Sequence, residues 1–274
     1  MKQQKHSIAY NMIKKLTSNF LILISKAIVI FPAFILNGCV FSDEAILNKA
    51  YEKFELGYYE SAIEDFDKVI KSNPKYDEAY LYRGISNYYL DNIWNAKSDL
   101  NKANDCKASY YLGLISLYND KDTASATTYF TTASVLYGKD NYTLARASYF
   151  LGKLQYELMQ SVSYKSDKYF EHRDEAMNNF NRSIKAEKYY EWGFLGKGMI
   201  HYSDGYYDSA YNDVSMAIIL NNKLSWAYYF RALCEKKLNG NQQAICDDYK
   251  KAIKYQEEEG EKIIDSVGLG EGCR

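Results

Sequence analysis

The residues best suited to metal or redox chemistry in this chain are five cysteines and three histidines. No Cys-x2-Cys pair or neighbouring histidine exists, so the spacing that holds a metal ion is missing. His6, His172 and His201 belong to no HExxH motif, and the sequence has neither a GxSxG elbow nor a Walker-type glycine loop. The sequence therefore predicts no catalytic residue, no metal site and no cofactor.

Two other patterns resemble functional motifs only superficially. The glycine run from Gly193 to Gly198 lacks phosphate-loop spacing and falls in a predicted helix, so Gly196 and Gly198 are interpreted as helix-crossing positions. The acidic cluster from Glu257 to Glu261 could hold a cation, but carboxylates also complement the N-terminal end of a helix dipole. We expect this cluster to begin a solvated helix.

The N-terminal segment has the layout of a secretory signal. Five lysines and no acidic residue precede Gly38, and an apolar run extends from Phe20 to Leu36. The run ends in Leu36-Asn37-Gly38-Cys39, which resembles the lipobox of bacterial lipoproteins. The resemblance implies removal of residues 1–38, lipid attachment to Cys39 and a short linker to residue 44. An uncleaved membrane anchor is the alternative, since roughly 20 apolar residues can span a bilayer.

This leader places the rest of the chain in the bacterial cell envelope, anchored to a membrane by N-terminal lipid. Val40 is not the aspartate that favours inner-membrane retention in enterobacterial lipoproteins. We therefore predict an outer-membrane location, with the chain facing either the periplasm or the cell surface.

A repeat organises the remaining residues. The chain has 29 tyrosines and only two prolines, which favours long uninterrupted helices. A small residue followed by a bulky one four positions later recurs, and the leading alanines are spaced by 34, 30, 50, 34 and 34 residues. These alanines are Ala62, Ala96, Ala126, Ala176, Ala210 and Ala244. The bulky partners begin with Phe66, Leu100 and Phe130 and degrade to Asp248 in the last unit.

The period of 34 residues resembles the tetratricopeptide repeat (TPR), a pair of antiparallel helices. The Leu112-Gly113 and Leu151-Gly152 pairs fit the family pattern, as do the turn glycines Gly57 and Gly205. The resemblance implies an all-α, right-handed α-solenoid of about six helix pairs over residues 45–255. Residues 161–172 form an insertion, which could be a binding loop or an extension of two helices.

The same resemblance assigns ten aromatic residues to a concave groove, where Tyr and Trp make good anchors for a protein or peptide ligand. They are Tyr51, Phe54, Tyr88, Tyr110, Tyr149, Tyr156, Trp192, Tyr202, Trp226 and Tyr229. The alternative for each is a place in the core between repeats. A clamp for a chaperone tail is not expected, because the corresponding positions carry Leu47, Tyr51, Tyr82, Ile85 and Tyr111.

The cysteines after Cys39 are Cys106, Cys234, Cys246 and Cys273, which allow three complete pairings or four free buried thiols. The C-terminal sequence resembles the closing segment of TPR lipoproteins from Bacteroidetes-like bacteria. That resemblance implies a disulfide between Cys246 and Cys273 and a capping helix with a tail over residues 256–274. Such a cap would cover the last repeat.

Charge limits the class of partner. The whole chain has a net charge of −1, but without the leader 29 basic face 35 acidic residues, which gives −6 and disfavours nucleic acid. We predict a non-catalytic, membrane-anchored scaffold that binds a protein or peptide. The alternatives are a glycan-binding or accessory subunit of an outer-membrane carbohydrate-processing complex, and self-association through exposed repeat ends.

Overall fold

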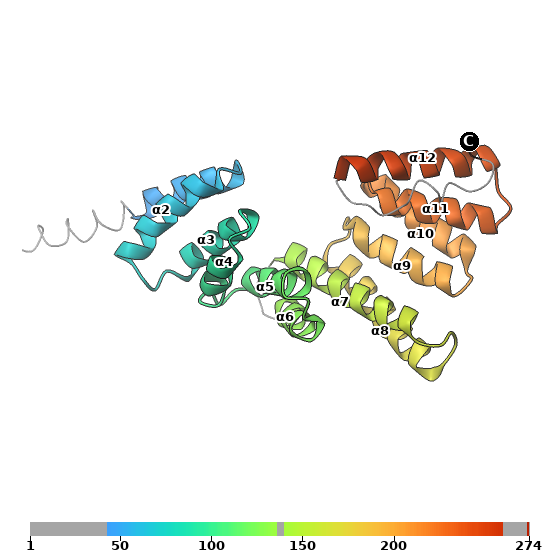
Figure 1. Cartoon of the computed structure of the whole chain (residues 1–274), viewed down its shortest axis with the longest axis horizontal. Coiled ribbons are helices and arrows are strands. Elements are labelled where there is room, and N and C mark those ends of the chain that lie inside the picture. Colours follow the sequence, from blue (N-terminus) through green and yellow to red (C-terminus); the bar gives the residue numbers. More distant parts are fainter. Residues whose placement is uncertain (1–42, 136–139, 260–272, 274) are drawn as a thin grey trace, which may run out of the picture. The chain divides into compact units, whose positions relative to one another are not determined.

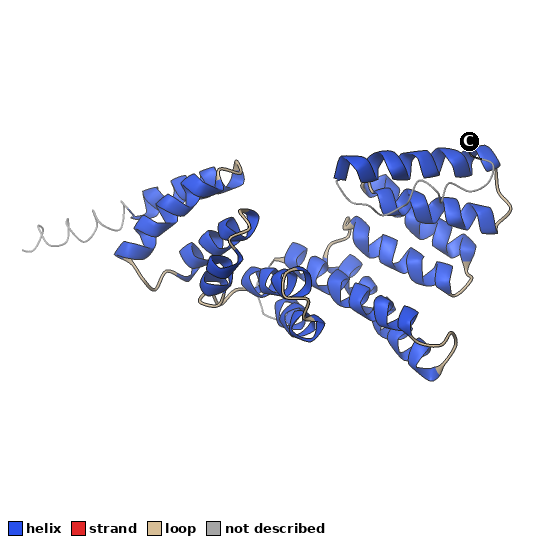
Figure 2. Cartoon of the chain, in the orientation of Figure 1, coloured by secondary structure: helices blue, strands red, loops and turns tan. Residues whose placement is uncertain are grey.

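The computed structural model describes residues 43–135, 140–259 and 273, which are helical and contain no strand (Figure 2). The chain divides into two compact units, residues 1–96 and 97–274. None of the described helices combines the length and the apolar composition needed to span a bilayer. Cys39 and the predicted leader lie outside the described residues.

The helices follow one another as antiparallel pairs along the chain (Figure 1). The first pair consists of residues 43–55 and α2 (Tyr59–Ser72), and the second of α3 (Asp77–Tyr89) and α4 (Ile93–Leu100). The later pairs are α5 (Cys106–Tyr118) with α6 (Thr123–Val135), α7 (Asn141–Ser161) with α8 (Asp167–Ala186), α9 (Glu191–Ser203) with α10 (Tyr207–Leu220), and α11 (Ser225–Lys237) with α12 (Gln242–Glu259). The short α4 explains the interval of 30 residues in the repeat.

A residue with left-handed backbone lies in the turn inside each of these pairs. Gly57 and Gly205 have φ values of 78° and 86°, as expected for glycine, which has no Cβ to clash. The equivalent turns elsewhere use residues with side chains, at φ values between 55° and 60°. They are Asp91, Lys121, Lys165 and Asn239. The regular turn geometry supports the division into six units.

The first unit has its own apolar core. Ala50, Ala62, Phe66, Val69 and Ala79 are fully buried and pack together between the first three helices. Asp65 is also buried in this unit, and its carboxylate accepts hydrogen bonds from the ammonium groups of Lys53 and Lys68. Burial alone would raise the pKa of Asp65, but these two hydrogen bonds outweigh it and hold the pKa below its ordinary value.

In the second unit, small residues of one helix meet bulky residues of another. A Cβ atom added to Gly113 would lie 2.7 Å from the ring of Phe130, and one added to Gly152 would lie 2.7 Å from that of Phe180. Gly196 also faces the ring of Phe180, and Gly198 faces Val214. The interpretation of Gly196 and Gly198 as helix-crossing positions is thereby confirmed.

The last pair replaces the bulky apolar residue with an ion pair. Asp248 is buried, and both of its carboxylate oxygens accept hydrogen bonds from Arg231 of α11, at 2.6 and 2.7 Å. Such a bidentate contact satisfies both groups in the buried environment. In the last repeat, this ion pair between α11 and α12 thus takes the place of the apolar contact that the bulky residue makes in other repeats.

The insertion lengthens two helices. α7 has 21 residues and α8 has 20, and only a short turn at residues 162–166 separates them. The Oγ atom of Ser166 caps α8 by accepting a hydrogen bond from the backbone N–H of Tyr169. The stretch 161–172 therefore consists of helix ends and one turn.

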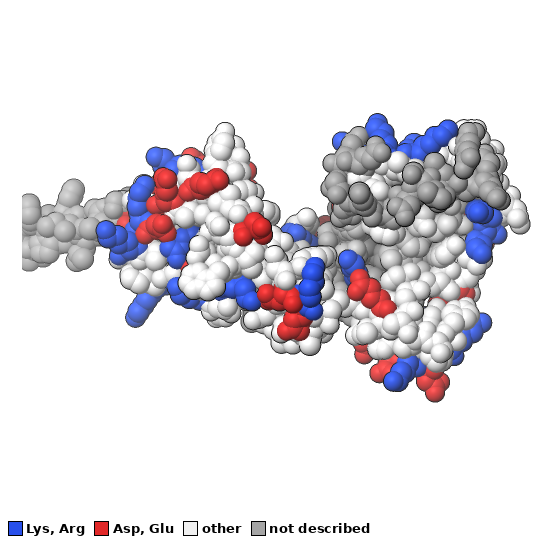
Figure 3. Space-filling model, in the orientation of Figure 1, with Lys and Arg blue, Asp and Glu red and all other residues white. Residues whose placement is uncertain are grey.

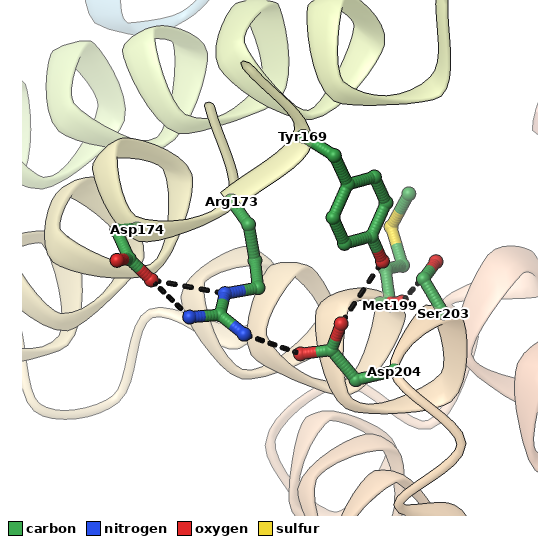
Figure 4. Close-up of polar contacts among 6 residues, drawn as sticks. All are labelled: Tyr169, Arg173, Asp174, Met199, Ser203 and Asp204. Atoms are coloured by element: carbon green, nitrogen blue, oxygen red, sulfur yellow. Dashed lines mark hydrogen bonds and ion pairs between the residues drawn. The ribbon is translucent and has the colours of Figure 1, made fainter. Parts of the chain in front are cut away.

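The tip of this long hairpin is linked to α9 (Figure 4). The buried Tyr169 donates a hydrogen bond from its hydroxyl to Asp204 Oδ1, at 2.9 Å, and Asp204 directly follows α9. Arg173 binds Asp174 and lies 3.7 Å from the second oxygen of Asp204 (Figure 4). These contacts fix the α7–α8 hairpin against the end of α9.

At the C-terminal end, α12 continues through Glu259. Glu257, Glu258 and Glu259 therefore close this helix and do not begin another one, because the first helix-breaking residue after Gln242 is Gly260. The capping helix and tail were predicted over residues 256–274; residues 256–259 belong instead to α12, and residues 260–272 and 274 lie outside the described residues. Cys273 is described, and its Sγ is joined to that of Cys246 in α12, with their Cα atoms 5.2 Å apart. Cys106 and Cys234 are free thiols and are buried.

Candidate functional site

α7 presents a polar and aromatic stripe on one face. Asp140 begins the helix by accepting hydrogen bonds from the backbone N–H groups of Tyr142 and Thr143, both at 3.1 Å. From this start, residues recur at alternating intervals of four and three, the spacing that keeps side chains on one face of a helix. The stripe consists of Tyr142, Arg146, Tyr149, Lys153 and Tyr156, and all five line one cavity.

This cavity, here called the Arg146 cavity, has a volume of about 370 Å³ and lies wholly within the second unit. It is lined mainly by the first helices of successive pairs, α5, α7, α9 and α11, which contact one another in that order. Its other lining residues are Tyr110, Tyr118, Phe150, Phe180, Tyr190, Glu191, Trp192, Leu195, Met199 and Trp226. The volume falls in the range of pockets that bind small ligands or a few side chains of a peptide.

Aromatic contacts hold the walls of the cavity in place. Tyr149 meets Trp192 with ring centroids 5.5 Å apart and Tyr190 at 6.1 Å. Phe150 stacks on the buried ring of Phe130 at 4.9 Å. Because these rings come from different helix pairs and pack on buried residues, the cavity is built into the repeat array and needs no separate loop.

Arg146 is enclosed by phenol rings. Its guanidinium carbon lies 4.4 Å from the centroid of the Tyr110 ring and 5.4 Å from that of Tyr142. Burial acts to lower the pKa of Arg146, but the neighbouring Tyr110 and Tyr111 outweigh it, so the pKa is raised and the side chain stays charged. Within residues 43–135, 140–259 and 273, no carboxylate lies in ion-pair contact with this guanidinium.

The other two charged residues of the cavity differ from Arg146. Lys153 lies 3.9 Å from Glu157 on the same helix and 5.9 Å from the ring centroid of Tyr118. Glu191, at the start of α9, accepts a hydrogen bond from the side chain of Asn221 at 3.3 Å. Both therefore have a polar partner from the protein.

Tyr190 and Tyr156 are neutral phenols in this cavity. Burial raises the pKa of Tyr190 well above its ordinary value, and nearby phenols add to this effect. Burial also raises the pKa of Tyr156, against an opposing hydrogen bond with Ser203. The groups directly beside the Arg146 guanidinium are thus ring faces, and Glu191, which lines the same cavity, forms no ion pair with it among the described residues.

A second cavity of about 420 Å³ lies beside the long hairpin. Residues of the 162–166 turn and of α8 contribute Val162, Tyr164 and Tyr169, and the later helices contribute Tyr202, Tyr207 and Phe230. Tyr156 lines both cavities. The insertion therefore forms part of a hollowed surface.

The ten predicted groove residues fall in four places. Five line the Arg146 cavity, namely Tyr110, Tyr149, Tyr156, Trp192 and Trp226, and Tyr202 lines the second cavity. Tyr51 and Phe54 pack against the core of the first unit and against Tyr82, while Tyr88 of the same unit contacts Tyr89. Tyr229 packs between α11 and α12, 6.0 Å from the ring of Tyr249.

Arg146 and Tyr190 were not predicted. Arg146 is not aromatic and so is not one of the groove residues that the repeat implies, although Tyr142, Arg146 and Tyr149 share one helix face by their spacing of four and three. Tyr190 precedes α9, so a groove built from helix positions omits it. The sequence signal for Arg146 is a basic residue that lies between aromatic residues at helical spacing.

The histidines of the described chain have structural partners. His172 Nδ1 lies 2.9 Å from Gln155 Oε1, and His201 Nδ1 lies 2.7 Å from Asp213 Oδ2. Across the described part of the chain, no three His, Cys, Asp or Glu side chains come together to hold a metal ion.

Basic and acidic side chains are intermixed on the face of the molecule drawn in Figure 3, and uncharged residues cover much of it. The exposed apolar side chains include Trp94, which is 80% exposed in α4 of the first unit. On this face, the basic side chains of the described residues therefore do not form a long continuous patch.

The comparisons with known proteins identify the fold. No family model and no curated protein matches the chain. Among solved structures, it resembles pilF of Pseudomonas aeruginosa with a TM-score of 0.60 and 15% identity, over 81% of this chain and 91% of that one. It also resembles PilW, described as a widely conserved type IV pilus biogenesis factor, with a TM-score of 0.53 and 16% identity over 79% and 91% of the two chains.

A third similar structure is the C-terminal part of a TPR repeat-containing protein from Cytophaga hutchinsonii, with a TM-score of 0.50 and 16% identity over 78% and 80% of the chains. Consecutive helix pairs, recurring crossing residues and these likenesses together define an all-α protein of the TPR fold. The fold implied by the repeat pattern is confirmed.

Proposed function

We propose that the chain is a non-catalytic scaffold that binds an extended segment of a partner protein in the Arg146 cavity. The observation that supports this most directly is the convergence of four first helices on one aromatic cavity of about 370 Å³. Tyr and Trp rings offer large contact areas with little loss of conformational freedom, which makes them effective binding anchors. Proteins with this fold serve as interaction scaffolds, so the assignment agrees with the fold as well.

The proposal includes a membrane anchor. Cleavage before Cys39 and lipid attachment to that cysteine would fix the binding surface at a membrane of the bacterial envelope, and we propose the outer membrane. Mass spectrometry of the N-terminus of the purified protein tests this step. A lipid-modified Cys39 is the expected result, and an intact, unmodified Met1 would refute it.

Partner recovery from a detergent extract tests the binding site. We expect the double variant Tyr149→Ala, Trp226→Ala to lose the partner that the wild-type protein recovers, because both rings line the cavity. The matched control is Tyr189→Ala, Tyr206→Ala, since these two rings are 66% and 64% exposed and line neither described cavity. Circular dichroism should confirm that both variants remain helical.

Equal recovery by wild-type protein and cavity variant would exclude the Arg146 cavity as the partner site. A glycan array on the same samples distinguishes the alternative function, in which the aromatic rings stack on sugars. Binding to glycans without any recovered protein would favour that alternative. Light scattering of the chain without its leader would reveal self-association.

A further inference from the structure

We propose that the Arg146 cavity recognises a carboxylate of its peptide ligand, carried by an acidic residue next to an aromatic or large apolar one. This inference deepens the function proposed above and rests on it. It identifies the chemistry of the ligand from Arg146, a cation of the cavity that has neither an ion pair nor a side-chain hydrogen bond among the described residues.

The first support is the unused hydrogen-bonding capacity of Arg146. A guanidinium has five N–H donors in a planar fork, and stacking on a ring face leaves the edge of that plane free. The group lies 4.4 Å from the centroid of Tyr110, and no carboxylate of the described residues pairs with it. A ligand carboxylate could accept two of these N–H bonds in parallel.

The second support is the desolvation cost of holding the charged Arg146 guanidinium among aromatic rings without a carboxylate partner. A charge held among rings loses hydration, and attraction to the aromatic faces compensates for only part of that loss. Elsewhere this chain pairs its half-buried arginine, since Arg231 binds Asp248 through two hydrogen bonds. Arg146 differs in facing a cavity that is open to a ligand.

The third support is the charge around the site. Arg146 and Lys153 lie two helical turns apart on the same face of α7, and both line the cavity. Glu157 reaches only Lys153, at 3.9 Å, and Glu191 is held by Asn221. Two basic side chains and one acidic side chain thus line the cavity, so a ligand carboxylate can pair with Arg146, while the Trp192 and Trp226 rings line the wall beside an apolar neighbour.

The experiment selects peptides from a random phage-displayed library on the full-length protein in detergent. We expect enrichment of peptides with Asp or Glu beside Phe, Tyr, Trp or Leu. The best peptide is then synthesised with its acidic residue as Glu and, in a twin, as Gln. By calorimetry the Gln twin should bind at least about tenfold more weakly, because a hydrogen-bonded charge is lost.

Protein variants locate the recognition. Arg146→Met should weaken the Glu peptide by the same factor but leave the Gln twin nearly unchanged, and Arg146→Lys should fall between because it lacks the planar fork. Arg182→Met is the matched control, since Arg182 contacts the backbone oxygen of Ser134 and lines neither described cavity. It should bind like the wild type.

The outcomes separate this inference from the function on which it rests. Enriched peptides without an acidic residue, equal binding of the two twins, or full affinity in Arg146→Met would overturn carboxylate recognition and leave the scaffold function intact. The twins test the wild-type protein, so misfolding of a variant cannot imitate the result. A library that yields no enriched peptide would contradict both proposals.

Discussion

At the scale of single residues, Phe180 controls the packing of three helices. Its ring extends from α8 to Gly152 of α7 and to Gly196 of α9, and it also reaches the wall of the Arg146 cavity. The two glycines let the helix backbones approach this ring closely. Substitutions at these positions therefore change packing directly beneath the cavity.

We expect Gly152→Ala to lower the free energy of unfolding by about 1–2 kcal/mol. The added Cβ would lie 2.7 Å from the Phe180 ring, and overpacking costs about 1–3 kcal/mol while better helix propensity returns at most about 1 kcal/mol. Urea denaturation followed by circular dichroism measures the change. Gly152→Ala combined with Phe180→Leu should recover part of the loss, whereas a fully stable single variant would show that the ring can move aside.

Asp65 makes the stability of the first unit depend on pH. Its folded-state pKa is held below the unfolded value of about 3.9. The stabilisation is therefore present above the unfolded pKa and is lost as the pH falls through the folded pKa. We expect Asp65→Asn to cost about 2 kcal/mol at pH 7 and progressively less as the pH is lowered below the unfolded pKa, as measured by denaturant unfolding.

The control for this prediction is Asp67→Asn. Asp67 pairs with Arg83, but its side chain is 55% exposed, so its removal should cost less than about 1 kcal/mol at pH 7. A cost for Asp65→Asn that stays constant from pH 7 to 2.5 would contradict the role of its ionised form.

At the scale of helices, the sequence was sufficient to predict the pairs but not their lengths. Ala62, Ala126 and Ala210 are fully buried where the repeat pattern placed them, because only small side chains fit at a helix crossing. The sequence left two structures open for residues 161–172, a loop or an extension of two helices. Tertiary contacts such as the hydrogen bond between Tyr169 and Asp204 stabilise the extended helices, and these contacts are not visible in the sequence. Half of the predicted groove residues line the Arg146 cavity. Tyr51 and Tyr229 instead pack against apolar cores. A residue's position in the repeat does not by itself show whether its side chain faces the groove or the core.

The hairpin of α7 and α8 should loosen when its link to α9 is removed. We expect Tyr169→Phe to raise amide hydrogen exchange in the 162–166 turn and the first turn of α8, since a hydrogen bond to a carboxylate contributes about 1.5–3 kcal/mol. Mass spectrometry of exchanged peptides measures this. Tyr164→Phe is the control, because the Tyr164 side chain is 59% exposed. Unchanged exchange in Tyr169→Phe would mean that ring packing alone holds the hairpin.

At the scale of the whole molecule, the disulfide between Cys246 and Cys273 joins α12 to a residue that follows it at a sequence separation of 27. Closing a loop of this length stabilises the folded state by about 3.5 kcal/mol in the chain-entropy description. We expect a reductant to lower the unfolding midpoint of the wild-type protein. It should leave the double variant Cys246→Ser, Cys273→Ser unaffected, and an equal response of both proteins would point to another cause.

The positions of the three tryptophans give the protein a built-in optical signal. Trp192 and Trp226 line the Arg146 cavity, whereas Trp94 lies in the first unit and is 80% exposed. In the variant Trp94→Phe, all intrinsic indole emission would come from the cavity. A peptide that enters it should shift that emission to shorter wavelengths and shield it from iodide quenching, so occupancy could be followed in solution without a label.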